Sequence, residues 1–169
     1  CLNNLPAKSI VLLHACCHNP TGADLTADQW SQVVEACKAR QLVPFLDMAY
    51  QGFAENIDAD AVAVRAFAAS GLQFIISSSF SKSFSLYGER VGALSIITAS
   101  KEESGRVLSQ LKRVIRTNYS NPPTHGGAIV SAVLSSPELR QMWEDELAGM
   151  RDRIRAMRTG LVEAISSKG

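Results

Sequence analysis

Residues 10–46, IVLLHACCHNPTGADLTADQWSQVVEACKARQLVPFL, decide the fold. They contain an apolar run at 10–14, a helical pattern after Thr26 and a second apolar run at 42–46. Both runs are short and continuously apolar, which is typical of strands buried on both faces of a parallel sheet. Thr26 and Gln29 form a capping-box pattern ahead of an apolar helical stripe. The stretch therefore predicts a strand, a helix and a second strand.

The same alternation continues to the end of the chain. Two further apolar runs predict strands at 74–79 and 91–97. Pro44 cannot donate to a ladder, so a central position for the second strand is awkward at its start. Apolar residues at helical spacing predict the helices, which are 26–37, 60–69 with Gly71 as its C′ residue, 101–115, one through 129–133, and one from Pro137 onward. This order predicts an α/β fold with a mostly parallel sheet flanked by helices.

Two of the predicted helices carry long apolar stripes. We expect the side chains of the 101–115 helix to point inward, namely Val107, Leu108, Leu111, Val114 and Ile115. The final helix has a wide stripe from Leu139 to Ile165. Such a stripe is typical of a packing face, and part of it can lean on something that the chain does not contain.

Composition excludes several classes of protein. The chain has 169 residues, of which 46% are hydrophobic and 20% are charged, as in an average globular domain. A net charge of +1 gives no electrostatic reason to expect nucleic acid or an anionic membrane as partner. No apolar run approaches the roughly 20 residues of a membrane span.

The cysteines and histidines show no metal-ligand spacing. The four cysteines include the adjacent pair Cys16 and Cys17, but no CxxC pair is present. The three histidines are scattered. The pattern predicts reduced, mostly buried thiols in a cytoplasmic protein, and no metal site.

Polar groups follow three successive predicted strands. Ligands bind outside the carboxyl ends of strands in open α/β sheets, so these groups are candidate ligand contacts. Any one of them is also an ordinary turn or cap residue, and it is their convergence that predicts a site. The groups are Asn19, Asp47, Tyr50, Ser79, Ser81, Lys82 and Arg90.

This set suits catalysis by pyridoxal phosphate. The aldehyde needs an amine such as Lys82, which forms a Schiff base and moves protons. A buried carboxylate such as Asp47 keeps the ring nitrogen protonated, so that the ring accepts electrons. Asn19 and Tyr50 can donate to the ring oxygen. The phosphate needs a cationic fork and hydroxyls, which are supplied by Arg90, Ser79 and Ser81.

Four motifs resemble the aspartate and aromatic-amino-acid aminotransferases, which are fold-type I pyridoxal-phosphate enzymes. They are HNPTG at 18–22, DxAYQGF at 47–53, SFSKxFxLYGERVG at 79–92 and RxNYSNPP at 116–123. The resemblance runs from about Ile10 to the end of the chain and is most specific around Lys82. Several blocks are most similar to the aromatic-amino-acid, or tyrosine, branch of the family.

The resemblance implies a role for each of these residues. Lys82 matches the Schiff-base lysine and proton shuttle, Asp47 the pyridinium partner, and Tyr50 and Asn19 the donors to the ring oxygen. Asn19 also matches a residue near the substrate. Ser79, Ser81 and Arg90 match the phosphate ligands, although Ser81 can act through the lysine instead. His14 and His18 either lie beside these direct contacts or are simply buried.

The assembly that the resemblance implies depends on Arg116. It matches an arginine that, in this family, reaches into the neighbouring subunit's site and binds the distal carboxylate of the substrate. The resemblance therefore implies a homodimer with shared active sites. The reaction implied is the transfer of an amino group between an aromatic amino acid, or aspartate, and a 2-oxo acid such as 2-oxoglutarate. An aspartate-specific aminotransferase and a catalytically inert fragment of either enzyme are the alternatives.

The family's amino-terminal part and its carboxy-terminal substrate arginine have no counterpart in the chain. Residues 1–136 are thus predicted to be a portion of the large cofactor-binding domain. Residues 137–169 are predicted to be a long helix that leads toward a small domain. On this interpretation the 169 residues alone do not turn over substrate.

Two other classes of protein share parts of this pattern. Ser79-Phe-Ser-Lys82 also reads as the S-x-x-K motif of penicillin-recognising serine hydrolases. That chemistry needs the serine at the start of a helix and later S-D-N and K-T-G motifs, which the chain lacks. A non-catalytic binding module with the same fold is the other class, and intact Lys82, Asp47 and Arg90 argue against it.

Overall fold

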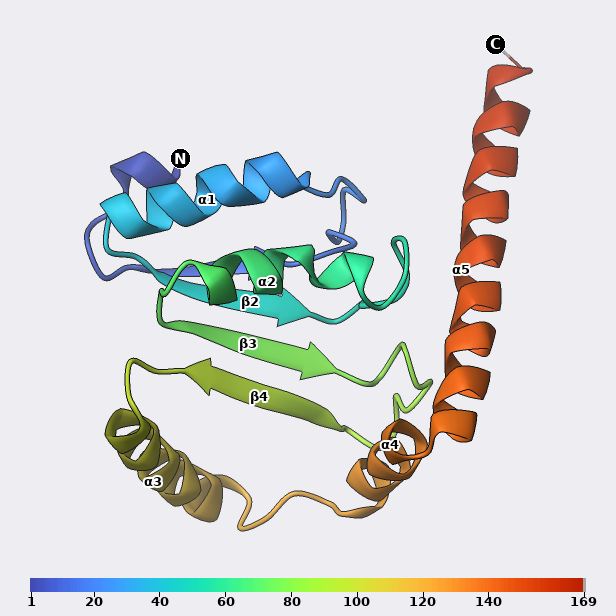
Figure 1. The fold of residues 1–169 in the computed structure, drawn as a ribbon. Helices are drawn as coiled ribbons and strands as arrows, with labels where there is room; N and C mark the ends of the chain where they lie inside the picture. Colours follow the sequence, from blue (N-terminus) through green and yellow to red (C-terminus); the bar gives the residue numbers. More distant parts are fainter. Residues whose placement is uncertain (169) are drawn as a thin grey trace.

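Four strands form one sheet in the order β1-β2-β3-β4. The computed structural model describes residues 1–168. The strands are β1 Ile10–His14, β2 Val43–Met48, β3 Phe74–Ser79 and β4 Gly92–Ile97. The first three run parallel, and β4 is antiparallel to β3 (Figure 1). The predicted α/β fold with a mostly parallel sheet is confirmed.

The helix after Thr26 begins at its predicted cap, and the last helix begins at Pro137 as predicted. The helices are η1 Leu2–Asn4, α1 Ala27–Ala39, η2 Ala59–Ala61, α2 Val62–Ala69, α3 Lys101–Asn118, α4 His125–Ser135 and α5 Pro137–Ser166, where η marks a short 3-10 helix. At α1, Thr26 accepts from the amide of Gln29 while the Gln29 side chain accepts from the amide of Thr26, so the capping box is confirmed. Gly71, with a φ of 75°, follows the last cap residue of α2 as predicted.

The core lies between the sheet and the pair α1 and α2, which cover one face (Figure 1). Trp30 of α1 meets Phe67 of α2 edge-on, with 6.4 Å between ring centroids. Phe67 contacts Phe74 of β3 at 5.6 Å. Leu46 and Phe67 are fully buried, and burial of each such side chain contributes about 1.5–3 kcal/mol. This layer fixes the sheet against which the strand-end loops are built.

Burial on both faces of the sheet was the wrong expectation. The face away from α1 and α2 leaves Ile10 of β1 68% exposed, Leu12 61% and Leu94 of β4 53%. Burial alternates along β2, where Pro44, Leu46 and Met48 point into the core. One helix layer covers one face, so alternate side chains on the other face remain accessible.

The α3 stripe is likewise not a core face in this chain. None of the α3 residues is buried, and Leu108 and Val114 are 51% and 60% exposed. The amino-terminal end of α3 meets the sheet, where the Gln73 side chain donates to Glu103 at 2.6 Å. The rest of the helix extends beyond β4 (Figure 1), so its apolar side chains have little to pack against.

Pro44 lies inside central strand β2, opposite Val11 of β1. The amide of Val43 donates to Ser9 on the β1 side, so the nitrogen of Pro44 faces β3. Pairing of β2 with β3 starts only at Phe45 and Ile75. The missing N–H therefore costs no ladder hydrogen bond at this position.

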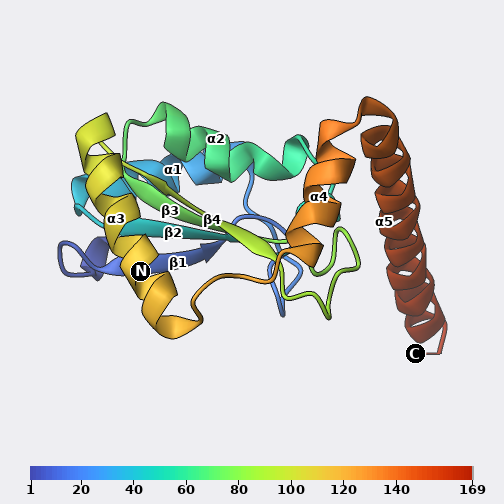
Figure 2. The same cartoon turned by 90° about the horizontal axis from the view of Figure 1, so that it is seen from below.

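Helix α5 lies across the carboxyl ends of the parallel strands (Figures 1 and 2). It begins at Pro137, and the hydroxyl of Ser136 accepts from the amide of Leu139 as its cap. Only the first half of its stripe packs, with Leu147 2% exposed, whereas Met157 and Leu161 are 59% and 62% exposed. Among the described residues, no helix combines the length and the hydrophobicity needed to cross a membrane.

Candidate functional site

One row of polar side chains crosses three strands near their carboxyl ends. His14, Asp47 and Ser77 are aligned in the registers of β1, β2 and β3. The Ser77 hydroxyl donates to Oδ1 of Asp47 at 3.3 Å. Asp47 lies within β2 rather than after it, because the strand extends to Met48. A strand backbone therefore fixes the carboxylate, and Ser77 is a contact that sequence patterns did not reveal.

Lys82 and Tyr50 come together beside this row. Tyr50 follows β2, and Lys82 lies in the turn that follows β3. The Lys82 Nζ is 5.1 Å from the centroid of the Tyr50 ring, which is a cation–π distance. Both side chains are half-buried. The structure thus brings the predicted amine and phenol to one side of the sheet edge.

The turn after β3 also carries the predicted phosphate ligands. The hydroxyl of Ser79 accepts from the amide of Ser81 at 3.2 Å. Across the antiparallel pair, the Phe80 amide donates to the carbonyl of Val91 at 3.2 Å. This register places residues 79–81 opposite residues 90–92. Arg90 has a φ of 51° and is exposed. Its Nη1 donates to the carbonyl of Tyr87, three residues earlier, at 3.2 Å.

Asn19 is held by His14. Its amide donates to Nδ1 of His14 at 3.2 Å, and the peptide bond from Asn19 to Pro20 is cis. The Nδ1 of His14 therefore acts as the acceptor for this backbone amide. The rings of His14 and His18 are 4.9 Å apart, and both residues are half-buried. His14 therefore contacts the backbone of Asn19, and neither histidine is fully buried.

The loop that carries Tyr50 is fixed by Asp60. The Asp60 carboxylate is buried and accepts from the amides of Gly52 at 2.7 Å, Ala54 at 3.0 Å and Glu55 at 2.8 Å. Three hydrogen bonds to one carboxylate hold the whole turn as a unit. The role of Asp60 was not predicted, because no motif links it to the loop.

Helix α5 contacts each of the three strand-end loops. Arg158 places its guanidinium against Gly22 of the first loop, 3.3 Å from where a Cβ would be. Arg151 donates from Nη1 to the Gly52 carbonyl of the second loop at 3.1 Å. Trp143 donates from Nε1 to the Ser83 carbonyl of the third loop at 2.6 Å. One helix thus contacts all three loops that carry the predicted site residues.

Two neighbouring cysteines of the first loop, Cys16 and Cys17, lie near the loop that carries Tyr50. The Sγ of Cys17 donates to the carbonyl of Tyr50 at 3.8 Å. The S–H of Cys16 hydrogen bonds to Cys17, which lowers the pKa of Cys17 and raises that of Cys16, and burial raises the pKa of Cys16 further. Cys17 is therefore the thiol that ionises first. All four cysteines are free, and Cys16 and Cys37 are buried whereas Cys1 is exposed.

Arg116 stands apart from these groups. It lies in the last turn of α3, which continues past the predicted end to Asn118, and its Nη1 donates to the Ser120 hydroxyl at 2.6 Å. Its side chain is exposed. Within residues 1–168, no hydrogen bond or ion pair joins it to the other predicted site residues.

A family model for class I and II aminotransferases matches residues 1–169. The chain belongs to this family. The aspartate aminotransferase of Pseudomonas aeruginosa is 69% identical to it over 168 residues, which cover 99% of this chain and 42% of that protein. The aromatic-amino-acid aminotransferase of Escherichia coli is 57% identical over 167 residues, with the same two coverages.

The solved aminotransferase structures agree. The aromatic-amino-acid aminotransferase of Burkholderia pseudomallei, covalently bound to pyridoxal phosphate, matches with a TM-score of 0.97 and 73% identity. The match covers 99% of this chain and 42% of that one. This aminotransferase chain therefore spans less than half the length of these relatives, and its fold is that of the corresponding part.

The position of Ser79 also excludes the serine hydrolase interpretation. Ser79 is the last residue of β3, and a turn follows it rather than the start of a helix. The serine of an S-x-x-K motif must lie at a helix start. In this chain Ser79 ends β3, and the residues that follow it form the turn that presents Lys82.

Proposed function

We propose that the chain is the cofactor-anchoring part of a pyridoxal-phosphate-dependent aminotransferase. The reaction is the transfer of an amino group between an aromatic amino acid, or aspartate, and a 2-oxo acid such as 2-oxoglutarate. The family and the identities above support this proposal. The observation that supports it most directly is the distance of 5.1 Å between the Lys82 Nζ and the centroid of the Tyr50 ring, with Asp47 of β2 three residues before Tyr50 in the chain.

The residues at the strand ends fit pyridoxal phosphate. An amine, a carboxylate held by the Ser77 hydroxyl and a phenol match the aldehyde, the ring nitrogen and the ring oxygen of that molecule. The turn of residues 79–81 opposite Arg90 offers hydroxyls and a guanidinium for a phosphate. When bound, the cofactor supplies an electron sink for the carbanion formed at the substrate Cα.

Each residue then has one task. Lys82 binds the aldehyde through its amine and carries the proton between the substrate Cα and the cofactor. Asp47 keeps a proton on the ring nitrogen, and Ser77 holds the carboxylate in place. Tyr50 and Asn19 donate to the ring oxygen, and Asn19 also faces the substrate.

The phosphate grip and the substrate grip are separate. Ser79, Ser81 and Arg90 bind the phosphate, with Ser81 alternatively acting through Lys82. Arg116 binds the distal carboxylate of a substrate in the active site of a second copy, which accounts for its distance from the other groups. The working enzyme is on this proposal a cytoplasmic homodimer. Residues 1–136 belong to its large domain, and residues 137–169 lead toward a small domain.

Cofactor capture by the chain itself tests the proposal. The 169-residue chain is incubated with pyridoxal phosphate, reduced with borohydride and mapped by peptide mass spectrometry. We expect one modified amine, Lys82, and no modification at that peptide in Lys82→Arg. The exposed lysines Lys8 and Lys101 serve as internal controls. Equal labelling of Lys8 and Lys82 at limiting cofactor would contradict a built site.

Turnover is measured on the complete gene product. Lys82→Ala is expected to abolish transamination, and Asp47→Ala is expected to retain cofactor while proton abstraction slows by orders of magnitude. The 169-residue chain alone is expected to show no turnover. The ratio of kcat/KM for tyrosine and aspartate separates an aromatic-amino-acid enzyme from an aspartate-specific one, and both types occur among the relatives.

A further inference from the structure

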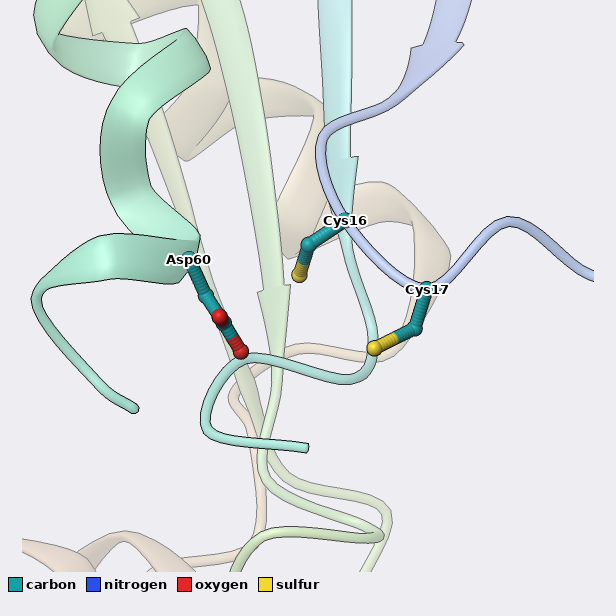
Figure 3. Close-up of side chains that lie close together, drawn as sticks. All are labelled: Cys16, Cys17 and Asp60. Carbon is teal, nitrogen blue, oxygen red and sulfur yellow. The ribbon is translucent and has the colours of Figure 1, made fainter. Parts of the chain in front are cut away.

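Two adjacent cysteines and a buried carboxylate meet behind the Tyr50 loop. The Sγ atoms of Cys16 and Cys17 and a carboxylate oxygen of Asp60 all lie within 4.8 Å of one another (Figure 3). The cysteines follow β1, whereas Asp60 lies in η2, so only the fold brings them together. We infer that these three side chains form a binding site for one thiophilic divalent cation, with Zn²⁺ as the expected ion.

The carboxylate is positioned before any cation arrives. Asp60 accepts two amides on Oδ2, from Gly52 and Ala54, and one on Oδ1, from Glu55. An ionised carboxylate offers about four lone-pair positions, so one remains for a metal. Hydrogen bonds to the outer side of a ligating carboxylate are the usual means of orienting it. Asp60 can therefore hold the turn and ligate a cation at once.

The cysteine backbone is fixed as well. The amide of Cys17 donates to Oδ2 of Asp24 at 2.9 Å, and the next amide, of His18, donates to Oδ1 at 3.0 Å. Cys17 has a φ of 51°, a left-handed conformation that turns its side chain toward the same space as Cys16. Two neighbouring residues thereby present both thiols to one point, which an extended backbone prevents because it directs alternate side chains to opposite faces.

The donor set selects the ion. Thiolate ligands favour Zn²⁺ and related soft cations over Mg²⁺ and Ca²⁺. Zn–S bonds of about 2.3 Å in a tetrahedron place two sulfur atoms about 3.8 Å apart, so the two sulfur atoms need to approach each other by no more than about 1 Å. Three protein ligands leave the fourth position for water, and half-buried Cys17 gives access from solvent.

Charge is offset only in part. Two thiolates and one carboxylate bring three negative charges, of which a divalent cation offsets two. The guanidinium of Arg158 lies against Gly22 of the same loop and favours the charged form of Cys17, whereas the nearby carboxylate of Asp24 opposes it. A cation at this cluster therefore relieves repulsion among several acidic groups, which is costly in a partly buried place. Sequence spacing predicts no such site, because Asp60 is remote from the cysteines in the chain.

Cadmium binding by the chain tests the inference. The reduced, chelator-treated 169-residue chain is titrated with Cd²⁺, and the thiolate-to-cadmium absorbance band in the near ultraviolet is followed. We expect one Cd²⁺ per chain, displaced by Zn²⁺ and not by Mg²⁺. Cys16→Ser and Cys17→Ser should each weaken binding at least tenfold. Cys37→Ser and Cys1→Ser, which alter one buried and one exposed thiol elsewhere, should bind as the parent does.

Several results would overturn the inference. They are the absence of a saturable band, a stoichiometry that survives in the Cys16→Ser, Cys17→Ser double variant, and loss of binding in Cys1→Ser. If a variant fails to fold by circular dichroism, the cadmium NMR shift of the unaltered chain still reports whether two sulfurs ligate the ion. None of these measurements uses pyridoxal phosphate or turnover, so their failure leaves the proposed function untouched.

Discussion

Arg151 on α5 donates a hydrogen bond to the carbonyl of Gly52 across a sequence separation of 99 residues. The same glycine donates its amide to Asp60 at 2.7 Å. Gly52 is buried, so both of its backbone groups depend on these two charged side chains. The turn after Tyr50 is in this way held from two directions, by Asp60 of η2 and by Arg151 of the long helix α5.

Removal of the arginine donor should destabilise the chain. Arg151→Met keeps much of the apolar stem but leaves the buried Gly52 carbonyl without its donor, which costs about 1–3 kcal/mol. The measurement is the free energy of unfolding by urea. Arg153→Met is the matched control, because Arg153 lies on the same helix and is exposed. Equal losses for the two variants would show that the bond to Gly52 contributes nothing.

Two glycines allow strain and collision to be separated. Gly52 has a φ of 96°, and an added Cβ would lie 2.4 Å from Cδ2 of Leu147 and 2.9 Å from Cδ1 of Ile57. Gly71 has a φ of 75° but nothing within 4 Å. Gly71→Ala should cost only backbone strain of about 1–2 kcal/mol. Gly52→Ala should cost about 1–3 kcal/mol more for overpacking, as measured by thermal and urea unfolding. A smaller loss at Gly52 than at Gly71 would contradict the packing described.

The indole of Trp143 anchors the loop that presents Lys82. Trp143 stacks on Phe84, with ring centroids 4.4 Å apart, and donates to the Ser83 carbonyl. Trp143→Phe preserves an aromatic ring but removes the donor, so a loss of about 1 kcal/mol is expected. Trp143→Leu should lose the stacking as well. If the phenylalanine variant is as stable as the parent, the hydrogen bond is not a net contributor.

Thiol reactivity should distinguish Cys17 from Cys37. The hydrogen bond from Cys16 lowers the pKa of Cys17, while burial raises the pKa of Cys37. The thiolate is the nucleophile, so half-buried Cys17 should react with iodoacetamide at a lower pH than Cys37. Fragmentation mass spectrometry locates the label within the peptide that holds both residues. In Cys16→Ala the donor is removed, so the midpoint of the Cys17 reaction should rise, and an unchanged midpoint would remove Cys16 as the cause.

The sequence predicted the local structure well, because its signals are local. The capping box of Thr26 and Gln29, the helix start at Pro137 and the C′ residue Gly71 each depend on neighbours within a few residues. The strand-end groups were also predictable, since parallel strands bring their carboxyl ends to one edge.

Contacts between segments that are remote in the chain could not be predicted from the sequence. Nothing in the pattern around Arg151 or Asp60 indicates that they meet at Gly52. The prediction that the α3 stripe points inward was wrong. Periodicity shows that Val114 belongs to an apolar face, but it does not show what covers that face.

Helix α5 connects the three strand-end loops to one another. Because the same helix meets the loops at Gly22, Gly52 and Ser83, a shift along its axis changes all three loops together. Linkage requires the converse: a ligand that favours one arrangement of those loops favours one position of the helix by the same free energy. A partner on the exposed outer half of α5 that favours one helix position would change affinity at the strand ends by the same factor as a strand-end ligand changes the affinity of that partner.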